Sequence, residues 1–372
     1  MAKLSKKLSG IFITVFIIGF LTLTLIREKG EISFHENRRL AEMPEISDLK
    51  DGKYFEKLEK YFSDHFAFRS KLVNINSKTS LYIGEPIING VYVSGGMMLN
   101  ADKRNNITEW KSAEAINEYA EKSKGSVYVM AVPASDGIYI EKLPEYLRSI
   151  TQKSQIDSFY ASLNTGVKKI DAYNTLKMLN ENYIYYRNDT KWTSYGAFCV
   201  YRTAIQKLGF LPVTYDKYKI EHAGVDFRGD LYNKTLYTDT KADMIDVYVC
   251  INGKEVVDVT AYDSSLKEMK MGLYHKEYLQ TNDPYSFYLG GEDVIKIKTD
   301  VGNDKKLLVI KDEYADCFIP FLTQHYSEIA VVSGKCRLSD YAEVINPDEY
   351  GQTLFLFGAD NLVNENCIAS QG

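Results

Sequence analysis

The chain has 372 residues, of which 45% are hydrophobic and 26% are charged. This composition is enough to bury a core and excludes a mainly disordered protein. With 45 Lys and Arg against 50 Asp and Glu, the formal net charge is −5. A nucleic-acid-binding protein needs a basic face to meet phosphates, so that class is disfavoured. The 29 tyrosines favour β-rich or sugar-facing surfaces, although we expect most of these rings to pack in the core.

The N-terminus is predicted to be a membrane anchor. A run of 19 uncharged residues begins at Leu8 and ends at Ile26, directly after Lys3, Lys6 and Lys7. As a helix it would be about 28 Å long, enough for the hydrocarbon core of a bilayer. The positive-inside rule places the N-terminus in the cytoplasm and the rest outside, as a single-pass cell-membrane protein. A cleaved signal peptide is the alternative, but no Ala-x-Ala-like site follows the run.

The chain is expected to divide into three parts. Residues 1–28 form the cytoplasmic stub and the transmembrane anchor, and residues 29–80 form a stalk with a membrane-proximal helix. Apolar residues at three- and four-residue spacings predict that helix over residues 52–80. Residues 81–372 form an α/β domain, and within it residues 214–301 alternate like β-strands with an Asn252-Gly253 turn, which predicts a β-rich insertion.

Short apolar strands alternate with helices in the rest of this domain. Strands are expected at residues 126–134, 167–173, 306–312, 328–333 and 353–358, and helices at residues 113–124, 155–164, 193–208 and 315–325. Such alternation predicts parallel βαβ units in an open three-layer sheet. Reactive groups in these sheets lie at the carboxyl ends of the strands.

The cysteines do not indicate a metal site. Cys199, Cys250, Cys317, Cys336 and Cys367 show no CxxC or CxxH spacing, so zinc has no support in the sequence. An odd number outside the cell leaves at least one thiol unpaired. Cys317 and Cys336 lie beside predicted neighbouring strands and could meet, and the alternative is that all five are free, mostly buried thiols.

Four segments together resemble the DHHW family of bacterial surface proteins, which are related to SGNH-hydrolase-like alginate O-acetylation proteins. They are YIYYRNDTKWTSYGAF (183–198), VIKDEYADCFIPFLTQHYSEIAVV (309–332), YFSDHFAFRSKLV (61–73) and GVYV (90–93). The resemblance spans about residues 36–362. It implies an SGNH-like three-layer fold in which an Asp-x-His-Trp segment precedes a nucleophilic serine. In that triad Asp orients His, His takes the serine proton, and Ser attacks an ester carbonyl.

Two triad positions depart from the family pattern. Asp189 and Trp192 match, but Lys191 occupies the position of the catalytic histidine and Glu313 that of the serine. A lysine can act as a base only if its pKa of about 10.4 falls toward 7, and flanking carboxylates have the opposite effect. A glutamate nucleophile would give a labile anhydride instead of an ester. Conventional esterase or acetyltransferase chemistry is therefore not expected.

The paired changes suggest a charge ladder of Asp189, Lys191 and Glu313 that fills the former triad. A buried ammonium or carboxylate is costly alone, whereas the three groups could satisfy one another. The alternative is independent drift of exposed residues. The two carboxylates could instead hold a hard cation, but the intervening lysine argues against a metal.

The sequence offers few other reactive groups. Ser194 is expected to contact backbone groups at a helix start, and His65 and His325 are expected to be structural.

An aromatic and polar set beside the ladder suggests a glycan-binding platform, because sugars stack on aromatic rings. Its members are Tyr186, Arg187, Trp192 and Tyr314. The alternative is that these rings belong to the core.

The predicted function is a catalytically degenerate, extracytoplasmic component of cell-envelope polysaccharide O-acetylation. It would bind glycan or partner proteins, and it would need no cofactor. The resemblance implies a multi-spanning membrane O-acyltransferase as the natural partner. The alternative is an active carbohydrate O-acetyltransferase or esterase with a non-standard nucleophile, and a purely structural envelope protein is a third reading.

Overall fold

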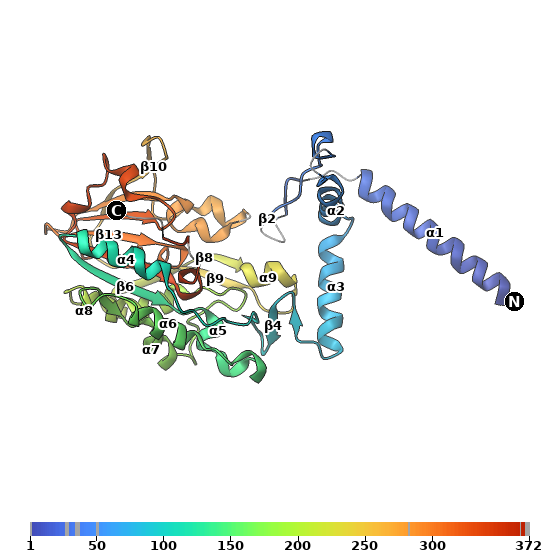
Figure 1. Cartoon of the computed structure of the whole chain (residues 1–372), viewed down its shortest axis with the longest axis horizontal. Coiled ribbons are helices and arrows are strands. Elements are labelled where there is room, and N and C mark those ends of the chain that lie inside the picture. The colour runs from blue at the N-terminus through green and yellow to red at the C-terminus, as the bar shows by residue number, and fades with distance from the viewer. Residues whose placement is uncertain are drawn as a thin grey trace.

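The computed structural model of the chain describes residues 2–26, 30–33, 38–49, 52–281, 283–364 and 366–368 (Figure 1). The predicted anchor coincides with one helix, α1 (Ala2–Ile26), which projects away from the main body. Within the described ranges no helix meets the length and apolarity that crossing a membrane requires. The anchor stays a prediction.

The predicted stalk contains the short pair β1 (Ile32–Ser33) and β2 (Arg38–Arg39) and the 3₁₀ turn η1 (Ile46–Leu49). Residues 29, 34–37 and 50–51 of this predicted stalk lie outside the described residues.

The single helix predicted for residues 52–80 is wrong, because two helices occupy this region. They are α2 (Tyr54–His65) and α3 (Arg69–Tyr82). Between them Phe66 is extended and Phe68 adopts a left-handed conformation with a φ of 58°. The three- and four-residue spacing of apolar residues continues across this corner, so the sequence pattern could not show that the helix is broken there.

A small module links α3 to the main domain. It comprises the sheet β3 (Ile87–Ile88), β4 (Val91–Ser94) and β5 (Met97–Asn100), together with α9 (Asp230–Thr235). Side chains of these elements share a separate apolar cluster, against which α3 packs.

The main sheet has eight strands in the order β11-β10-β12-β14-β13-β15-β6-β7. The parallel part contains β6 (Ser126–Val132), β7 (Lys168–Ile170), β13 (Lys306–Lys311), β14 (Glu328–Ser333) and β15 (Gln352–Gly358). The strands β10 (Val256–Tyr262), β11 (Glu268–Lys270) and β12 (Val294–Thr299) extend it with antiparallel pairings. The sheet is therefore mixed, which corrects the prediction of a parallel sheet.

The predicted β-rich insertion is not a separate unit. Its strands β10, β11 and β12 belong to the main sheet, and only β8 (Tyr218–Phe227) and β9 (Asp243–Cys250) form a hairpin of their own. The sequence showed alternating strands correctly, but the pairing partners of β12 lie 30 or more residues away in each direction along the chain.

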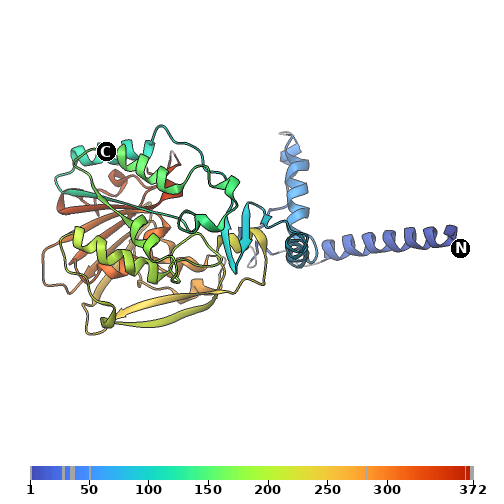
Figure 2. The same cartoon turned by 90° about the horizontal axis from the view of Figure 1, so that it is seen from below.

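Helices cover both faces of the sheet (Figure 2). One layer contains α4 (Lys111–Lys122), α6 (Gln152–Ala161) and α11 (Ala359–Leu362), and the other contains α7 (Ala172–Met178), α8 (Ser194–Lys207) and α10 (Ile319–Leu322). The short helix α5 (Ser135–Ile138) follows β6. The helix predicted for residues 315–325 is reduced to α10, which has Pro320 in its first turn. The strand predicted for residues 167–173 ends at Ile170, because Asp171 caps α7.

The fold brings three strand ends to one edge. Glu313 and Asp312 follow β13, Asn361 follows β15, and Ser135 follows β6, and these strands are neighbours in the parallel sheet. None of the five cysteines, all of which lie in the described ranges, forms a disulfide, so Cys317 and Cys336 are not bonded to each other.

Candidate functional site

The segment that carries Asp189 is fixed by a buried aspartate on β9. The Asp243 carboxylate accepts the backbone N–H groups of Arg187 at 2.9 Å and Asn188 at 3.0 Å, and the Asn188 side-chain amide at 2.8 Å. Asp243 has no exposed surface. Sequence reasoning missed this residue, since it lies more than 50 positions away from the segment it holds.

Asp189 is buried and held from both sides. Its Oδ1 accepts the Lys191 backbone N–H at 2.9 Å, and its Oδ2 accepts the Asp230 backbone N–H at 3.0 Å. Burial raises the pKa of Asp189 above its ordinary value. Gly229 makes this approach possible, because a Cβ there would lie 2.0 Å from Asp189 Oδ2.

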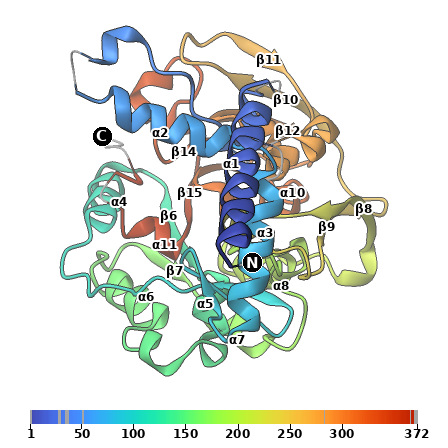
Figure 3. The same ribbon diagram turned by 90° about the vertical axis from the view of Figure 1, so that its right-hand side faces the viewer.

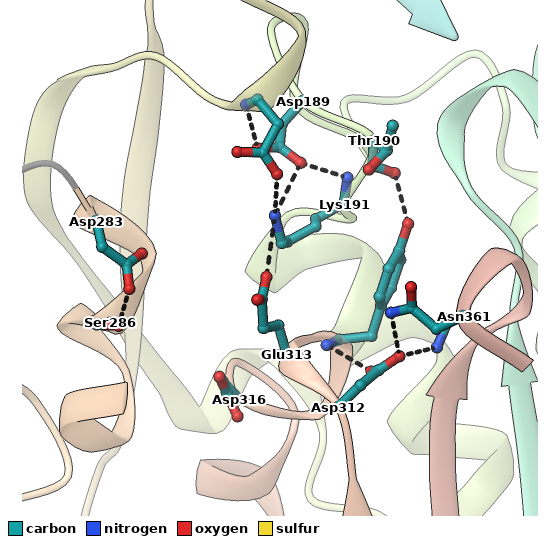
Figure 4. Close-up of polar contacts among 12 residues, drawn as sticks. Asp189, Thr190, Lys191, Asp283, Ser286, Asp312, Glu313, Asp316 and Asn361 are labelled. Carbon is teal, nitrogen blue, oxygen red and sulfur yellow. Dashed lines mark hydrogen bonds and ion pairs between the residues drawn. The ribbon is translucent and has the colours of Figure 1, made fainter. Parts of the chain in front are cut away.

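Lys191 is the centre of the site (Figure 4). Its Nζ lies 3.0 Å from Asp230 Oδ2, 3.3 Å from Glu313 Oε2 and 3.4 Å from Asp189 Oδ1. Burial alone lowers the pKa of Lys191, but the three carboxylates outweigh it and hold this pKa well above the ordinary value. The side chain is therefore an ammonium at neutral pH and cannot accept a proton.

The structure thus brings Asp189, Lys191 and Glu313 together and adds a carboxylate that sequence reasoning missed. Asp230 opens α9, about 40 residues beyond Lys191, and no spacing in the sequence links the two. The carboxylates differ in exposure: Asp189 is buried, whereas the Asp230 and Glu313 side chains are 59% and 67% exposed.

Beside Glu313 lies the carboxylate of half-buried Asp312. It accepts the backbone N–H groups of Gly358 at 2.7 Å and Tyr314 at 2.9 Å, and the Asn361 side-chain amide at 2.7 Å. Burial raises the pKa of Asp312 to about 6, although the three hydrogen bonds by themselves lower this pKa. Asp312 thereby ties the end of β13 to the end of β15 and fixes the position of Glu313.

Comparisons with known proteins identify the family and the fold. The model of the family described as DHHW protein matches residues 114–332, more than half of the chain. The chain belongs to the DHHW family. No curated protein matches it.

Two solved structures resemble this DHHW protein in fold. A DHHW family protein from Eubacterium siraeum is 24% identical, with a TM-score of 0.63, and the match covers 76% of this chain and 94% of that one. Bacillus cereus PatB1, solved with a sulfonyl adduct, is 18% identical with a TM-score of 0.63 and coverages of 75% and 98%. At these identities the likeness concerns the fold alone.

The aromatic residues predicted to bind glycan are core residues in this DHHW protein. Tyr186 and Trp192 have no exposed surface, and Tyr314 is also buried. The Trp192 indole donates to the Tyr314 carbonyl at 2.8 Å. Their ring faces are therefore closed to a sugar, which is the alternative that the sequence left open. Arg187 is partly exposed, but its guanidinium lies 4.4 Å from the Tyr183 ring centroid.

The remaining candidates lie outside the site. Ser194 donates to the Asp246 carbonyl at 2.7 Å, and His325 Nε2 lies 2.7 Å from the Tyr201 hydroxyl. Burial lowers the pKa of His325 to about 4. His65 Nδ1 lies 2.9 Å from a backbone carbonyl of α2. Across the described ranges no group of three or more His, Cys, Asp and Glu side chains could hold a metal ion.

Lys191 and its three carboxylate partners, Asp189, Asp230 and Glu313, form what we call the Lys191 cluster. Two pockets adjoin this cluster. A pocket of about 230 Å³ lies directly over it, and a larger one of about 480 Å³ opens beside Glu313. Asp283, Tyr285 and Glu313 line both. The larger pocket is lined by carboxylate, amide and hydroxyl groups, among them Glu292, Asp293, Ser333, Asn361 and Asn364. Its volume lies in the range of small-molecule sites.

Proposed function

We propose that this DHHW protein is a catalytically degenerate, glycan- or partner-binding component of cell-envelope polysaccharide O-acetylation. We further propose that α1 anchors it in the cell membrane with its main domain outside the cytoplasm. The observation that carries the proposal is the Lys191 ammonium, which is held by three carboxylates at the position where the family triad has a base.

The chemistry of an acyl transfer explains why this observation matters. The base must take a proton from the nucleophile, and an ammonium held between carboxylates has no free lone pair. Glu313, at the serine position, is an exposed carboxylate paired with that ammonium. Removing one member of a working triad costs several orders of magnitude in rate, and here two are replaced.

A binding role is supported by the pocket beside the cluster. Its amide and hydroxyl groups, at Asn361, Asn364 and Ser333, are the groups that hydrogen-bond sugar hydroxyls. The partner that the family resemblance implies, a multi-spanning membrane O-acyltransferase, would lie in the same membrane as α1.

Catalysis is tested by hydrolysis of 4-nitrophenyl acetate with the full-length chain in detergent. We expect no activity from the natural chain and measurable activity from the restored variant Lys191→His with Glu313→Ser. Adding Asp189→Ala to the restored variant should abolish it. Activity in the natural chain that Asp189→Ala removes would contradict the proposal and favour an enzyme with a non-standard nucleophile.

Binding is tested by titrating fragments of cell-envelope polysaccharide into the chain in a calorimeter. The variant Ser333→Trp would fill the larger pocket and should lose binding. Val257→Trp places the same ring at an exposed apolar position of β10 and should leave binding unchanged. Equal affinity of both variants would show that the pocket is not the binding site.

A further inference from the structure

Helix α3 uses only one of its two apolar faces to join the main domain. On its inner face, Ser77 is fully buried and donates to the Thr235 carbonyl at 2.6 Å. Val73 and Leu81, on the same face, pack against the apolar cluster of the small module. Asn74 extends this contact with a hydrogen bond of 3.0 Å to the Thr238 hydroxyl. The attachment of α3 to the domain is therefore complete without its other face.

The outer face of α3 carries a second apolar row, which we call the outer stripe. It consists of Phe68, at the N-cap, and Leu72, Ile75 and Tyr82. Leu72, Ile75 and Tyr82 lie three and seven residues apart and so on one side of the helix, and Phe68 precedes them at its N-cap. Their exposed fractions are 51%, 41%, 60% and 91%. At 1.5 Å per residue the stripe is about 21 Å long. It is therefore a continuous apolar row, unlike the single exposed apolar side chains that are common on protein surfaces.

Basic residues border the outer stripe. Helical spacing puts Lys71 and Lys78 along one edge of the stripe and Arg69 along the other. Both lysines are exposed, and the Lys71 ammonium lies 5.9 Å from the Phe68 ring centroid. Lys78 pairs with exposed Asp239 at 2.7 Å, a surface contact of low strength. An apolar row bordered by cations is typical of helices that lie in a membrane interface.

The outer stripe begins where α1 meets the body. The Phe20 ring of α1 lies 4.9 Å from the Phe66 ring and 6.1 Å from the Phe68 ring, between centroids. The Thr24 hydroxyl accepts the buried backbone N–H of Ala67 at 3.2 Å. In Figure 1 α3 stands between the main body and α1, and Figure 3, viewed from that side, shows α1 passing in front of α3. The face that bears the stripe thus adjoins the helix proposed to enter the membrane.

We propose that the outer stripe is a membrane-binding surface, with its apolar side chains at the headgroup–acyl boundary and the exposed Lys71 and Lys78 toward anionic headgroups. This goes beyond the proposed function, because it concerns how the main domain is held at a bilayer; it rests on the proposed α1 anchor but not on what the pocket binds. An interfacial helix and a spanning helix would together provide two membrane contacts. Two contacts fix the orientation of the main domain relative to the bilayer, whereas a single contact leaves it free to rotate.

The test uses tryptophan fluorescence of the full chain in liposomes that contain anionic lipid. Both natural tryptophans, Trp110 and Trp192, are buried, so a lipid-borne quencher should not reach them. The variant Ile75→Trp places a reporter on the stripe. Lipids brominated near the headgroups should reduce the emission of that reporter about twofold relative to unbrominated lipids. Leu211→Trp, at an apolar position that is 85% exposed beyond the end of α8, is the matched control and should not be quenched.

Each outcome decides the proposal. Quenching at position 75 without quenching at position 211 supports it, and weaker quenching in neutral lipids would assign part of the binding to the cations. A reporter at position 75 that is unquenched in liposomes carrying the chain would overturn it and leave the stripe to a protein partner. Failure of the chain to float with liposomes would overturn it as well. Neither result changes the esterase test of the proposed function.

Discussion

Two buried lysines at the same edge of the sheet are neutralised in different ways. Lys191 and Lys311 are each 6% exposed. Lys191 shares its charge among three carboxylates from three separate segments, two of which are largely exposed. Lys311 pairs, among the described residues, with Asp316 alone, which lies five residues further on; its Nζ is 2.5 Å from the Asp316 carboxylate, which is 5% exposed.

The difference separates a connecting cluster from a local pair. The Lys191 cluster ties the segment before α8, the start of α9 and the end of β13 together, and water can solvate its excess negative charge. Both members of the Lys311 pair are buried, so each depends on the other. Burial raises the pKa of Asp316 to about 7, against the attraction of Lys311. Removing a lysine should therefore have different costs at the two places.

The largest effect is expected for Lys311→Met at pH 8. It leaves the Asp316 carboxylate buried without its partner, so the free energy of unfolding should fall by about 3–5 kcal/mol in urea denaturation. Lys191→Met should cost only about 1–2 kcal/mol, since Asp189 keeps two backbone hydrogen bonds and the other carboxylates can turn to water. Because Asp316 protonates more readily at low pH, the cost of Lys311→Met should shrink at pH 5. Equal losses in the free energy of unfolding for Lys311→Met and Lys191→Met would show that the two lysines are not neutralised in different ways.

A charge reversal sharpens the comparison within the Lys191 cluster. Lys191→Glu adds a fourth carboxylate and should lower the free energy of unfolding by about 3 kcal/mol, clearly more than Lys191→Ala. Melting temperatures measured under the same conditions give the order directly. If both variants have the same melting temperature, close to that of the natural chain, the cluster does not stabilise the fold.

Asp312, which follows β13 beside Glu313, provides a pH test of the site. Its folded pKa of about 6 lies above the ordinary value of 3.8, so the folded chain holds a proton that the unfolded chain has lost between these values. Its contribution to stability is therefore greatest below pH 4 and declines as pH rises to about 6. The stability difference between the natural chain and Asp312→Asn should fall by about 2–3 kcal/mol from pH 4 to pH 7. A difference independent of pH would contradict the raised pKa.

The smallest effects are expected at the exposed members of the Lys191 cluster. Glu313→Gln and Asp230→Asn should each change the free energy of unfolding by less than about 1 kcal/mol, because solvent and salt screen exposed pairs. The residual effect should diminish further in 1 M salt. A loss as large as that of Lys191→Glu from either variant would mean that the cluster is less open to water than its exposure indicates.

The sequence by itself determined most strands and three helices of the main domain, and the identity of the family. The five parallel strands and helices α4, α6 and α8 lie close to where periodicity placed them, because the apolar pattern of an element is carried by its own residues. The motif segments likewise placed Asp189 and Lys191 before α8, and Glu313 at the end of a strand.

Tertiary structure alone decided which distant groups meet. Asp230, Asp243 and Gly229 contribute to the site from 40 to 54 positions away from Asp189, and no local rule pairs such residues. Three further features could not be predicted from local patterns either. They are the burial of Tyr186 and Trp192, the joining of β10–β12 to the main sheet, and the corner between α2 and α3. Each depends on packing between segments that the chain brings together only when it folds, and that packing free energy outweighs local preference.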